Sequence, residues 1–181
     1  MRWLVTPSLL NAWRYFIEGE HGDRAEWERT LRREPSPTNE ALQFGIEYEE
    51  ATWRGETAAS PYIQGSQYQL AESLRIGTQF LLYGRIDFLK AGEIIDLKTT
   101  RKYERPKYNH NFQTSAYLAL FPEAHKMTYL VYDRTTDHIF TESYFRDEVA
   151  PIATDIADFW RWLDTTGYRH VYEEHWRSRD D

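Results

Sequence analysis

Cysteine is absent from this sequence, and the absence excludes several kinds of structure. A chain without cysteine has no disulfide bonds, no zinc held by thiolates and no iron–sulfur cluster. The sequence also lacks any run of about 18 apolar residues, and its first residues are not a basic segment followed by an apolar one. We therefore expect a soluble protein of the reducing cytoplasm that has no membrane partner.

An excess of positive charge is lacking as well. The 22 lysines and arginines are outnumbered by 29 aspartates and glutamates, which gives a net charge of −7 and a pI near 5.4. This balance argues against a protein that coats nucleic acid through bulk attraction, but it allows a local site. Between Lys98 and His110 basic residues outnumber acidic ones, the reverse of the whole chain. The cations of this segment are candidates for holding phosphates, with a solvated loop as the alternative: Arg101, Lys102, Arg105 and Lys107.

The length and composition indicate one domain. A chain of 181 residues with 41% hydrophobic content can bury one substantial core, so we expect a single domain over residues 1–181. Its patterns are helical over 1–60, rich in strands over 61–145 with a helix inside that segment, and helical with a tail over 146–181. This order predicts an α/β fold in which a mixed central β-sheet is flanked by helices.

Apolar spacing and capping residues define the expected elements. Thr6-Pro7-Ser8 ahead of Leu9, Trp13 and Ile17 is typical of a capped amphipathic helix. Residues 21–37 are charged and end in Pro-Ser-Pro, which predicts a short helix or an irregular connection. Further helices are expected over 38–53, 107–121 and 148–163, strands over 62–74, 76–89, 93–98, 127–132 and 138–145, and a frayed end over 177–181.

Three charged residues lie near the ends of two neighbouring candidate strands. Asp87 ends the segment Gly84-Arg85-Ile86-Asp87, and Asp96 and Lys98 follow in the next strand. The segment between them contains Gly92 and is typical of a turn, so the two carboxylates are expected to meet across a hairpin. Mg²⁺ and Mn²⁺ prefer oxygen ligands, and a nearby ammonium can hold a water that attacks a phosphodiester. The pattern therefore indicates metal-dependent phosphodiester hydrolysis.

The alternative is that these charges are ordinary surface residues. Charged residues at strand ends are usually solvated, and an Asp-x-Lys triplet occurs by chance in many proteins. Ile94, Ile95 and Leu97 nevertheless make an apolar strand that we expect to be mostly buried. Buried Asp and Lys side chains are costly unless they are paired or bind an ion. We therefore favour a functional site over a surface accident.

Four segments in a fixed order resemble the PD-(D/E)XK nucleases, and within them the branch of RecB-like and phage exonuclease-like domains. They are Gly45-Ile46-Glu47-Tyr48-Glu49, Gly84-Arg85-Ile86-Asp87, Asp96-Leu97-Lys98 and Gln113-Thr114-Ser115-Ala116-Tyr117. The last is the Q-x-x-x-Y pattern that marks this branch. The resemblance extends from Thr6 to about Phe145 and implies a restriction-endonuclease-like core.

The resemblance also implies roles for individual residues. Glu49 occupies the helix position at which the family places a metal ligand, although Glu47 and Glu50 are close enough to leave that choice open. Asp87 and Asp96 resemble the two metal-binding carboxylates, with the Leu97 carbonyl as a further ligand, and Lys98 resembles the catalytic lysine. Gln113 and Tyr117 lie one helical turn apart, as expected for a pair that contacts DNA or supports the site; the alternative is a helix that merely packs on the sheet.

The activity implied by the resemblance is that of a Mg²⁺- or Mn²⁺-dependent deoxyribonuclease. We expect an exonuclease of phage-type recombination, replication or repair in a bacterial or phage-infected cell. Relatives with an iron–sulfur cluster use four cysteines, so that type is excluded here. The sequence has no helicase-like motif, so a motor or recombination protein would be a separate chain, and a homo-oligomer is also open. The alternatives are an inactive nuclease fold that binds DNA or inhibits, and an unrelated α+β domain.

Overall fold

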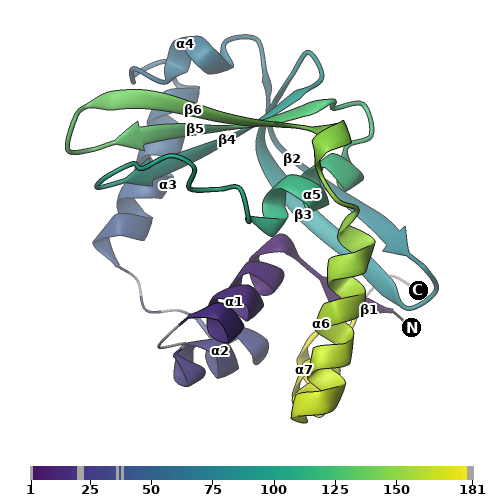
Figure 1. Ribbon diagram of the computed structural model, residues 1–181. Helices are drawn as coiled ribbons and strands as arrows, with labels where there is room; N and C mark the ends of the chain where they lie inside the picture. Colours follow the sequence, from purple (N-terminus) through teal and green to yellow (C-terminus); the bar gives the residue numbers. More distant parts are fainter. Residues whose placement is uncertain (1, 20–22, 36, 38, 179–181) are drawn as a thin grey trace.

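A mixed six-stranded β-sheet forms the centre of the protein (Figure 1). The computed structural model describes residues 2–19, 23–35, 37 and 39–178. Strand β1 pairs in parallel with β3, and β4 pairs in parallel with β5, whereas the other neighbours are antiparallel. The strands are β1 (Trp3–Val5), β2 (Gln67–Ile76), β3 (Phe80–Lys90), β4 (Glu93–Thr100), β5 (Lys126–Asp133) and β6 (His138–Phe145). The α/β class and the mixed sheet are thus confirmed.

Helices cover the sheet and divide its apolar residues into two cores. The larger core joins α1, α5 and α6 through residues such as Trp13, Tyr117 and Phe159, and the smaller one lies beside α4 and includes Ile63 and Leu97. Figure 1 shows α1, α2, α6 and α7 gathered together, away from α3 and α4. The helices are α1 (Pro7–Glu18), α2 (Arg24–Leu31), α3 (Glu40–Trp53), α4 (Ser60–Ile63), α5 (Phe112–Leu120), α6 (Ile152–Thr166) and α7 (Arg169–His175), with a 3₁₀ turn at Arg146–Glu148.

Local sequence signals set the starts of the main helices. Thr6 caps α1 by accepting a hydrogen bond from the Leu9 N–H at 3.2 Å, and Pro7 occupies the first turn. Asn39 caps α3 and Asn111 caps α5 in the same way, with distances of 2.8 and 2.9 Å. Side-chain capping satisfies N–H groups that have no partner inside the helix. No helix that the structure describes is long and apolar enough to cross a membrane.

Several expected elements differ from the observed ones. Of the two alternatives for residues 21–37, the short helix is the one observed, as α2, while residues 20–22, 36 and 38 lie outside the described part of the chain. The strand expected from residue 62 begins at Gln67, because α4 occupies the preceding turn. The strand expected from 76 begins at Phe80, after a turn that joins it to β2. Helix α6 begins at Ile152, since Pro151 and the preceding 3₁₀ turn replace its expected first residues.

Three short elements were not expected, and one expected helix start was wrong. Strand β1, α4 and α7 are short, and β1 exists only because β3 pairs with it. Helix α5 begins at Phe112 rather than at residue 107. The chain end expected to fray at 177–181 is partly ordered, because Arg177 bridges to Trp3, while 179–181 lie outside the described residues. Elements of this length carry too little periodicity to be recognised without their tertiary partners.

Candidate active site

The site lies where strands β3 and β4 separate. One edge of β3 pairs with β2 along most of its length, and the other edge pairs with β1 near Leu81 and with β4 near Leu89. The β3–β4 ladder ends at the pair Phe88 and Ile95, so the next residues along the two strands are Asp87 and Asp96. On its other edge β4 pairs with β5 along its whole length, from Glu93 to Thr100. The expected hairpin is present, and it brings the two carboxylates to the fork.

The fork leaves a backbone N–H free for a side chain. Leu97 lies beyond the end of the β3–β4 ladder, and its N–H donates a hydrogen bond to Asp87 Oδ2 at 2.8 Å. This bond ties the side chain of one strand to the backbone of the other. It fixes the Asp87 carboxylate beside β4, even though the ladder between the strands has ended.

Asp96 and Lys98 form an ion pair inside the site. Two residues apart on one strand, they point to the same face of the sheet, and Lys98 Nζ lies 2.6 Å from Asp96 Oδ2. The Asp96 side chain is 2% exposed and that of Lys98 is 26% exposed. Burial alone would lower the pKa of Lys98, but the carboxylates of Asp96 and Asp87 outweigh burial and raise it. Lys98 therefore carries a positive charge at neutral pH.

Asp87 sits in an unfavourable environment for a carboxylate. Burial, and then the negative charges of Asp96 and Glu49, raise the pKa of Asp87 well above its usual range. The charge of Lys98 and the N–H of Leu97 oppose this rise without cancelling it. Three carboxylates thus act on one another with a single ammonium between them. Such an excess of negative charge in one place is typical of a functional site that attracts a cation.

Helix α3 contributes Glu49 to this group. Glu49 is half-buried, and its Oε1 accepts a hydrogen bond from Gln69 Nε2 at 3.1 Å. Glu47 is exposed and accepts instead from Gln43 of its own helix at 2.7 Å. Glu50 is exposed too and lies 4.0 Å from Arg54 Nη1. Of the three glutamates, Glu49 is the one whose charge acts on both Asp87 and Lys98.

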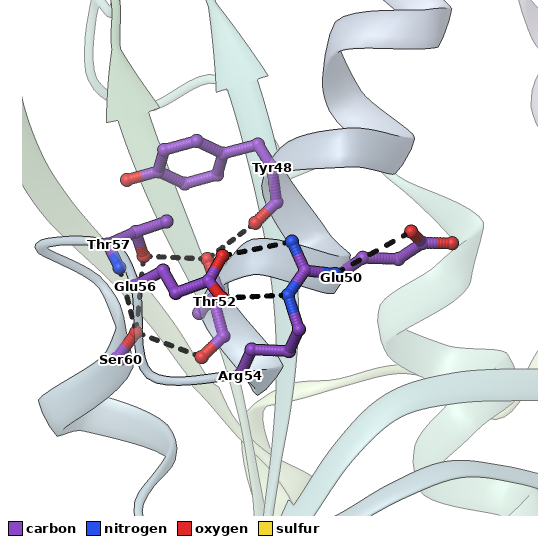
Figure 2. Close-up of polar contacts among 7 residues, drawn as sticks. All are labelled: Tyr48, Glu50, Thr52, Arg54, Glu56, Thr57 and Ser60. Atoms are coloured by element: carbon purple, nitrogen blue, oxygen red, sulfur yellow. Dashed lines mark hydrogen bonds and ion pairs between the residues drawn. The ribbon is translucent and has the colours of Figure 1, made fainter.

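A hydroxyl network anchors the end of α3 (Figure 2). Thr52, which is 1% exposed, donates to the Tyr48 carbonyl at 2.7 Å, and its Oγ1 lies 2.8 Å from Thr57 Oγ1. Ser60 Oγ donates to the Thr52 carbonyl at 2.9 Å. Figure 2 also shows Arg54 bridging Glu50 and Glu56 beside this network. The network connects α3 to α4 and so holds the helix that carries the Glu49 carboxylate.

Helix α5 closes the site from the other side. Gln113 Nε2 lies 3.5 Å from Asp96 Oδ1 and donates to the Tyr117 hydroxyl at 3.2 Å. Tyr117 is buried, and burial followed by the charge of Asp96 raises its pKa. A Cβ on Gly84 would lie 2.8 Å from Leu120 Cδ1 and 2.9 Å from Tyr117 Cε1. The missing side chain of Gly84 is therefore what lets α5 approach the strand that carries Asp87.

The basic segment that follows β4 forms an exposed loop beside the site. Lys107 Nζ donates to Thr100 Oγ1 at 2.8 Å, and Lys102 is paired with Glu104. All four cations of the segment are exposed, namely Arg101, Lys102, Arg105 and Lys107. The structure thus brings Glu49, Asp87, Asp96 and Lys98 together, and places the cations on an adjacent loop rather than among them.

Two buried acids on other strands hold this loop, and neither was predicted from the sequence. Glu142 of β6 is 2% exposed and accepts hydrogen bonds from the N–H groups of Lys107 and Tyr108 at 3.0 and 2.8 Å, and from the hydroxyl of Tyr103 at 2.6 Å. Burial opposes ionisation of Glu142, but these bonds lower its pKa. Asp133 accepts from the Tyr103 N–H at 2.8 Å. In the sequence each of them is a single acid near or within a strand, which does not by itself indicate that it binds a distant loop.

The donor chemistry of the site suits a hard divalent cation. Among the residues that the structure describes, no three His, Cys, Asp or Glu side chains already form a metal cage. The Leu97 N–H holds Oδ2 of Asp87, which leaves Oδ1 of Asp87 available to a cation. Asp96 faces Lys98 through Oδ2, and its Oδ1 lies 3.5 Å from Gln113 Nε2. Carboxylate oxygens are the ligands that Mg²⁺ and Mn²⁺ prefer. The repulsion that raises the pKa of Asp87 is what a cation would relieve.

Fold and site together define an α/β protein with two acids and a lysine at a fork of a mixed sheet. Residues 8–173 match the family model of the PD-(D/E)XK nuclease superfamily. The chain belongs to this superfamily, whose nucleases generally use divalent metal ions. No curated protein matches the chain.

Solved structures share the fold at low sequence identity. An alkaline exonuclease from Laribacter hongkongensis is 18% identical, with a TM-score of 0.58 over 90% of this chain and 88% of the other. A phage-related exonuclease from Haemophilus somnus 129PT is 15% identical, with a TM-score of 0.53 over 92% of this chain and 97% of the other. At this level of identity the likeness concerns the fold alone.

Proposed function

We propose that this protein is a metal-dependent deoxyribonuclease that hydrolyses phosphodiester bonds, acting as an exonuclease. One observation carries the proposal. Asp87 and Asp96 meet at the fork of β3 and β4, with the ammonium of Lys98 2.6 Å from Asp96 and the charge of Glu49 acting on Asp87. The segments that contain these residues resemble the motifs of the superfamily to which the chain belongs, and this resemblance supports the proposal.

Each residue would have a distinct role. Asp87 and Asp96 would hold one or two Mg²⁺ or Mn²⁺ ions, together with Glu49 and the Leu97 carbonyl. When bound, such an ion stabilises negative charge on the phosphate and lowers the pKa of a bound water. Lys98 has a raised pKa, so it would orient the attacking water as a hydrogen-bond donor rather than take its proton. Gln113 and Tyr117 would support Asp96 from α5.

DNA is the substrate that the surroundings of the site favour. A basic loop continues directly from β4, the strand of Asp96 and Lys98. Its cations would hold phosphates next to the scissile bond, and they are Arg101, Lys102, Arg105 and Lys107. The names of the two structural neighbours support exonuclease action. A role in phage-type recombination, replication or repair, as a homo-oligomer or beside a separate motor protein, extends the same proposal.

The test compares three DNA forms. The purified protein is incubated with Mn²⁺ and with end-labelled linear duplex, single-stranded or closed circular DNA. We expect the linear forms to be degraded and the circle to survive. We expect Asp96→Asn to reduce the rate by at least about a thousandfold, because the acid and the cation act together.

The control changes an acid of the same type elsewhere. Asp158→Asn alters an exposed residue of α6 that pairs with Arg161, and should leave cleavage unchanged. Full activity of Asp96→Asn would disprove the assignment of the site. Binding of DNA and stabilisation by Mn²⁺ without any cleavage would support the alternative, an inactive nuclease fold that serves as a DNA-binding or inhibitory module.

A further inference from the structure

One residue in the middle of β2 has a conformation that strands do not normally contain. Gln69 has a φ of +52°, whereas its neighbours continue the antiparallel ladder with β3. Tyr68 pairs with Phe88 and Leu70 pairs with Ile86, so the position opposite Gln69 is that of Asp87. Residues with a Cβ rarely adopt positive φ, and when they do so near an active site the strain is often part of the function.

The conformation directs the side chain of Gln69 at the site. Gln69 Nε2 donates to Glu49 Oε1 at 3.1 Å and to the Tyr68 hydroxyl at 3.0 Å. The bond to Glu49 joins residues that are 20 positions apart, on β2 and α3. Gln69 is therefore a direct connection between the helix carboxylate and the strand that faces Asp87.

Tyr68 supports this connection from a fixed position. Its ring stacks against those of Trp53 and Phe88, with centroid distances of 4.8 and 5.4 Å, and the three rings form one cluster. Burial, and then the charge of Glu49, raises the pKa of Tyr68 to about 12, so its hydroxyl keeps its proton at neutral pH. The amide of Gln69 thus lies against a rigid, uncharged neighbour. This arrangement restricts the positions that the Glu49 carboxylate can take.

We infer that Gln69 is a positioning residue that holds the Glu49 carboxylate towards Asp87 for cation binding. The inference rests on the proposed function, because it takes Glu49 as the ligand from the helix. The charges of Asp96 and Glu49 both act on Asp87, so the Glu49 carboxylate faces a like charge as it approaches Asp87. The hydrogen bond from the neutral Gln69 amide opposes that repulsion without adding charge. Partners of this kind orient metal ligands, and their loss typically weakens metal affinity or activity about 10–100-fold.

The first test variant is Gln69→Gly. Glycine adopts positive φ freely, so the variant can keep the backbone conformation while it removes the side chain that carries the amide. In EDTA its melting temperature should equal or exceed that of the unaltered protein. Its affinity for Mn²⁺, measured by calorimetry without DNA, should fall about 10–100-fold, and kcat should fall similarly while KM for DNA changes less than about threefold.

Two further variants separate positioning from structure. Gln69→Asn tolerates positive φ but is too short to reach Glu49, so it should show the same losses even if the glycine variant does not fold. Gln67→Gly changes the same residue type in the same strand, at a regular position paired with Leu89. It should lower the melting temperature and leave Mn²⁺ affinity unchanged, the opposite pattern to Gln69→Gly.

A double variant shows whether Gln69 acts through Glu49. In a Glu49→Ala background, Gln69→Gly should cause no further loss of Mn²⁺ affinity, because the residue that it positions is already gone. Additive losses would overturn the inference, as would wild-type Mn²⁺ affinity in both Gln69 variants. If the unaltered protein neither binds Mn²⁺ nor cleaves DNA, the proposed function itself fails, which is a different result.

Discussion

Asp87 shows at the scale of one residue how a cluster of carboxylates opposes stability. Its carboxylate is surrounded by Asp96 and Glu49, and its pKa is raised because the folded protein disfavours the charged form. An aspartate whose pKa is higher in the folded than in the unfolded chain makes the protein less stable above its unfolded pKa. The single ammonium of Lys98 does not remove this cost.

We expect Asp87→Asn to stabilise the protein in EDTA. The amide removes the repelled charge, and its oxygen can still accept the hydrogen bond from Leu97, so the gain should be about 1 kcal/mol. Chemical denaturation of the two proteins at pH 7 measures the difference. Added Mn²⁺ should reverse the order, because the ion would bind the charged carboxylate more tightly than the neutral amide. A less stable Asp87→Asn protein in EDTA would contradict the repulsion described here.

At the scale of elements, the approach of α5 to β3 depends on one glycine. The side chains of Tyr117 and Leu120 occupy the space that a side chain at position 84 would fill. Because Gln113 and Tyr117 lie on the same helix, a change at Gly84 also moves the residues next to Asp96.

We expect Gly84→Ala to destabilise the protein by about 1–3 kcal/mol, since the new Cβ would lie 2.8 Å from Leu120 and force α5 away. DNA cleavage should fall as Gln113 shifts from Asp96. The matched control is Gly45→Ala in α3, where the nearest atom to the new Cβ is Thr99 Oγ1 at 3.5 Å. That change should stabilise by about 0.5–1 kcal/mol through helix propensity. Thermal unfolding measures the stability of the two variants. Equal changes in melting temperature would show that α5 can move to accommodate the new Cβ at position 84.

The loop that follows β4 is a second element held by distant residues. Glu142 of β6 accepts hydrogen bonds from the backbone of Lys107 and Tyr108 and from Tyr103. Residues 107 and 108 thus belong to a loop held by β6, and α5 begins at Phe112, where Asn111 caps it, rather than at the predicted residue 107.

We expect Glu142→Gln to destabilise the protein by roughly 2 kcal/mol at pH 7, because charge-assisted hydrogen bonds to a buried group are lost. The pKa of Glu142 is lowered by folding, so its contribution is present above the unfolded pKa of about 4.3 and is lost as pH falls through its lower folded pKa. Denaturation curves measured from pH 7 to pH 3 should therefore converge for the two proteins. A constant difference across this range would mean that the charge is irrelevant.

At the scale of the whole molecule, a net charge of −7 opposes the approach of DNA. The exposed cations of the loop after β4 are the local exception. Binding should therefore depend on few phosphate contacts, and its dependence on salt should be correspondingly shallow.

We expect the paired change Arg101→Ala and Arg105→Ala to reduce the slope of log K against log salt by about 2 for duplex DNA, since each lost phosphate contact removes about 0.9. Binding is measured by fluorescence anisotropy in the inactive Asp96→Asn background. The control with the same change in net charge is Arg24→Ala with Arg161→Ala, two exposed arginines of α2 and α6. An equal loss of slope in the control would show that net charge, not the loop, governs binding.

The sequence by itself determined what depends on neighbouring residues. The caps of α1, the turn at Gly92 and the pairing of β3 with β4 follow from local chemistry, so the meeting of Asp87 and Asp96 at a hairpin was predictable. The spacing of Asp96 and Lys98 placed them on one face of a strand, where they form an ion pair. Signals of this kind survive in a sequence because they need no distant partner.

Only the tertiary structure decided which side chains from distant segments lie close to the fork of β3 and β4. It distinguished Glu49 from Glu47 and Glu50 by their surroundings, and it revealed the bond from Gln69, 20 residues away. It also showed that Glu142 holds a loop 35 residues distant. These contacts arise from how α3, β2 and β6 are packed, and a side chain's partner across such separations depends on the whole fold rather than on its own segment.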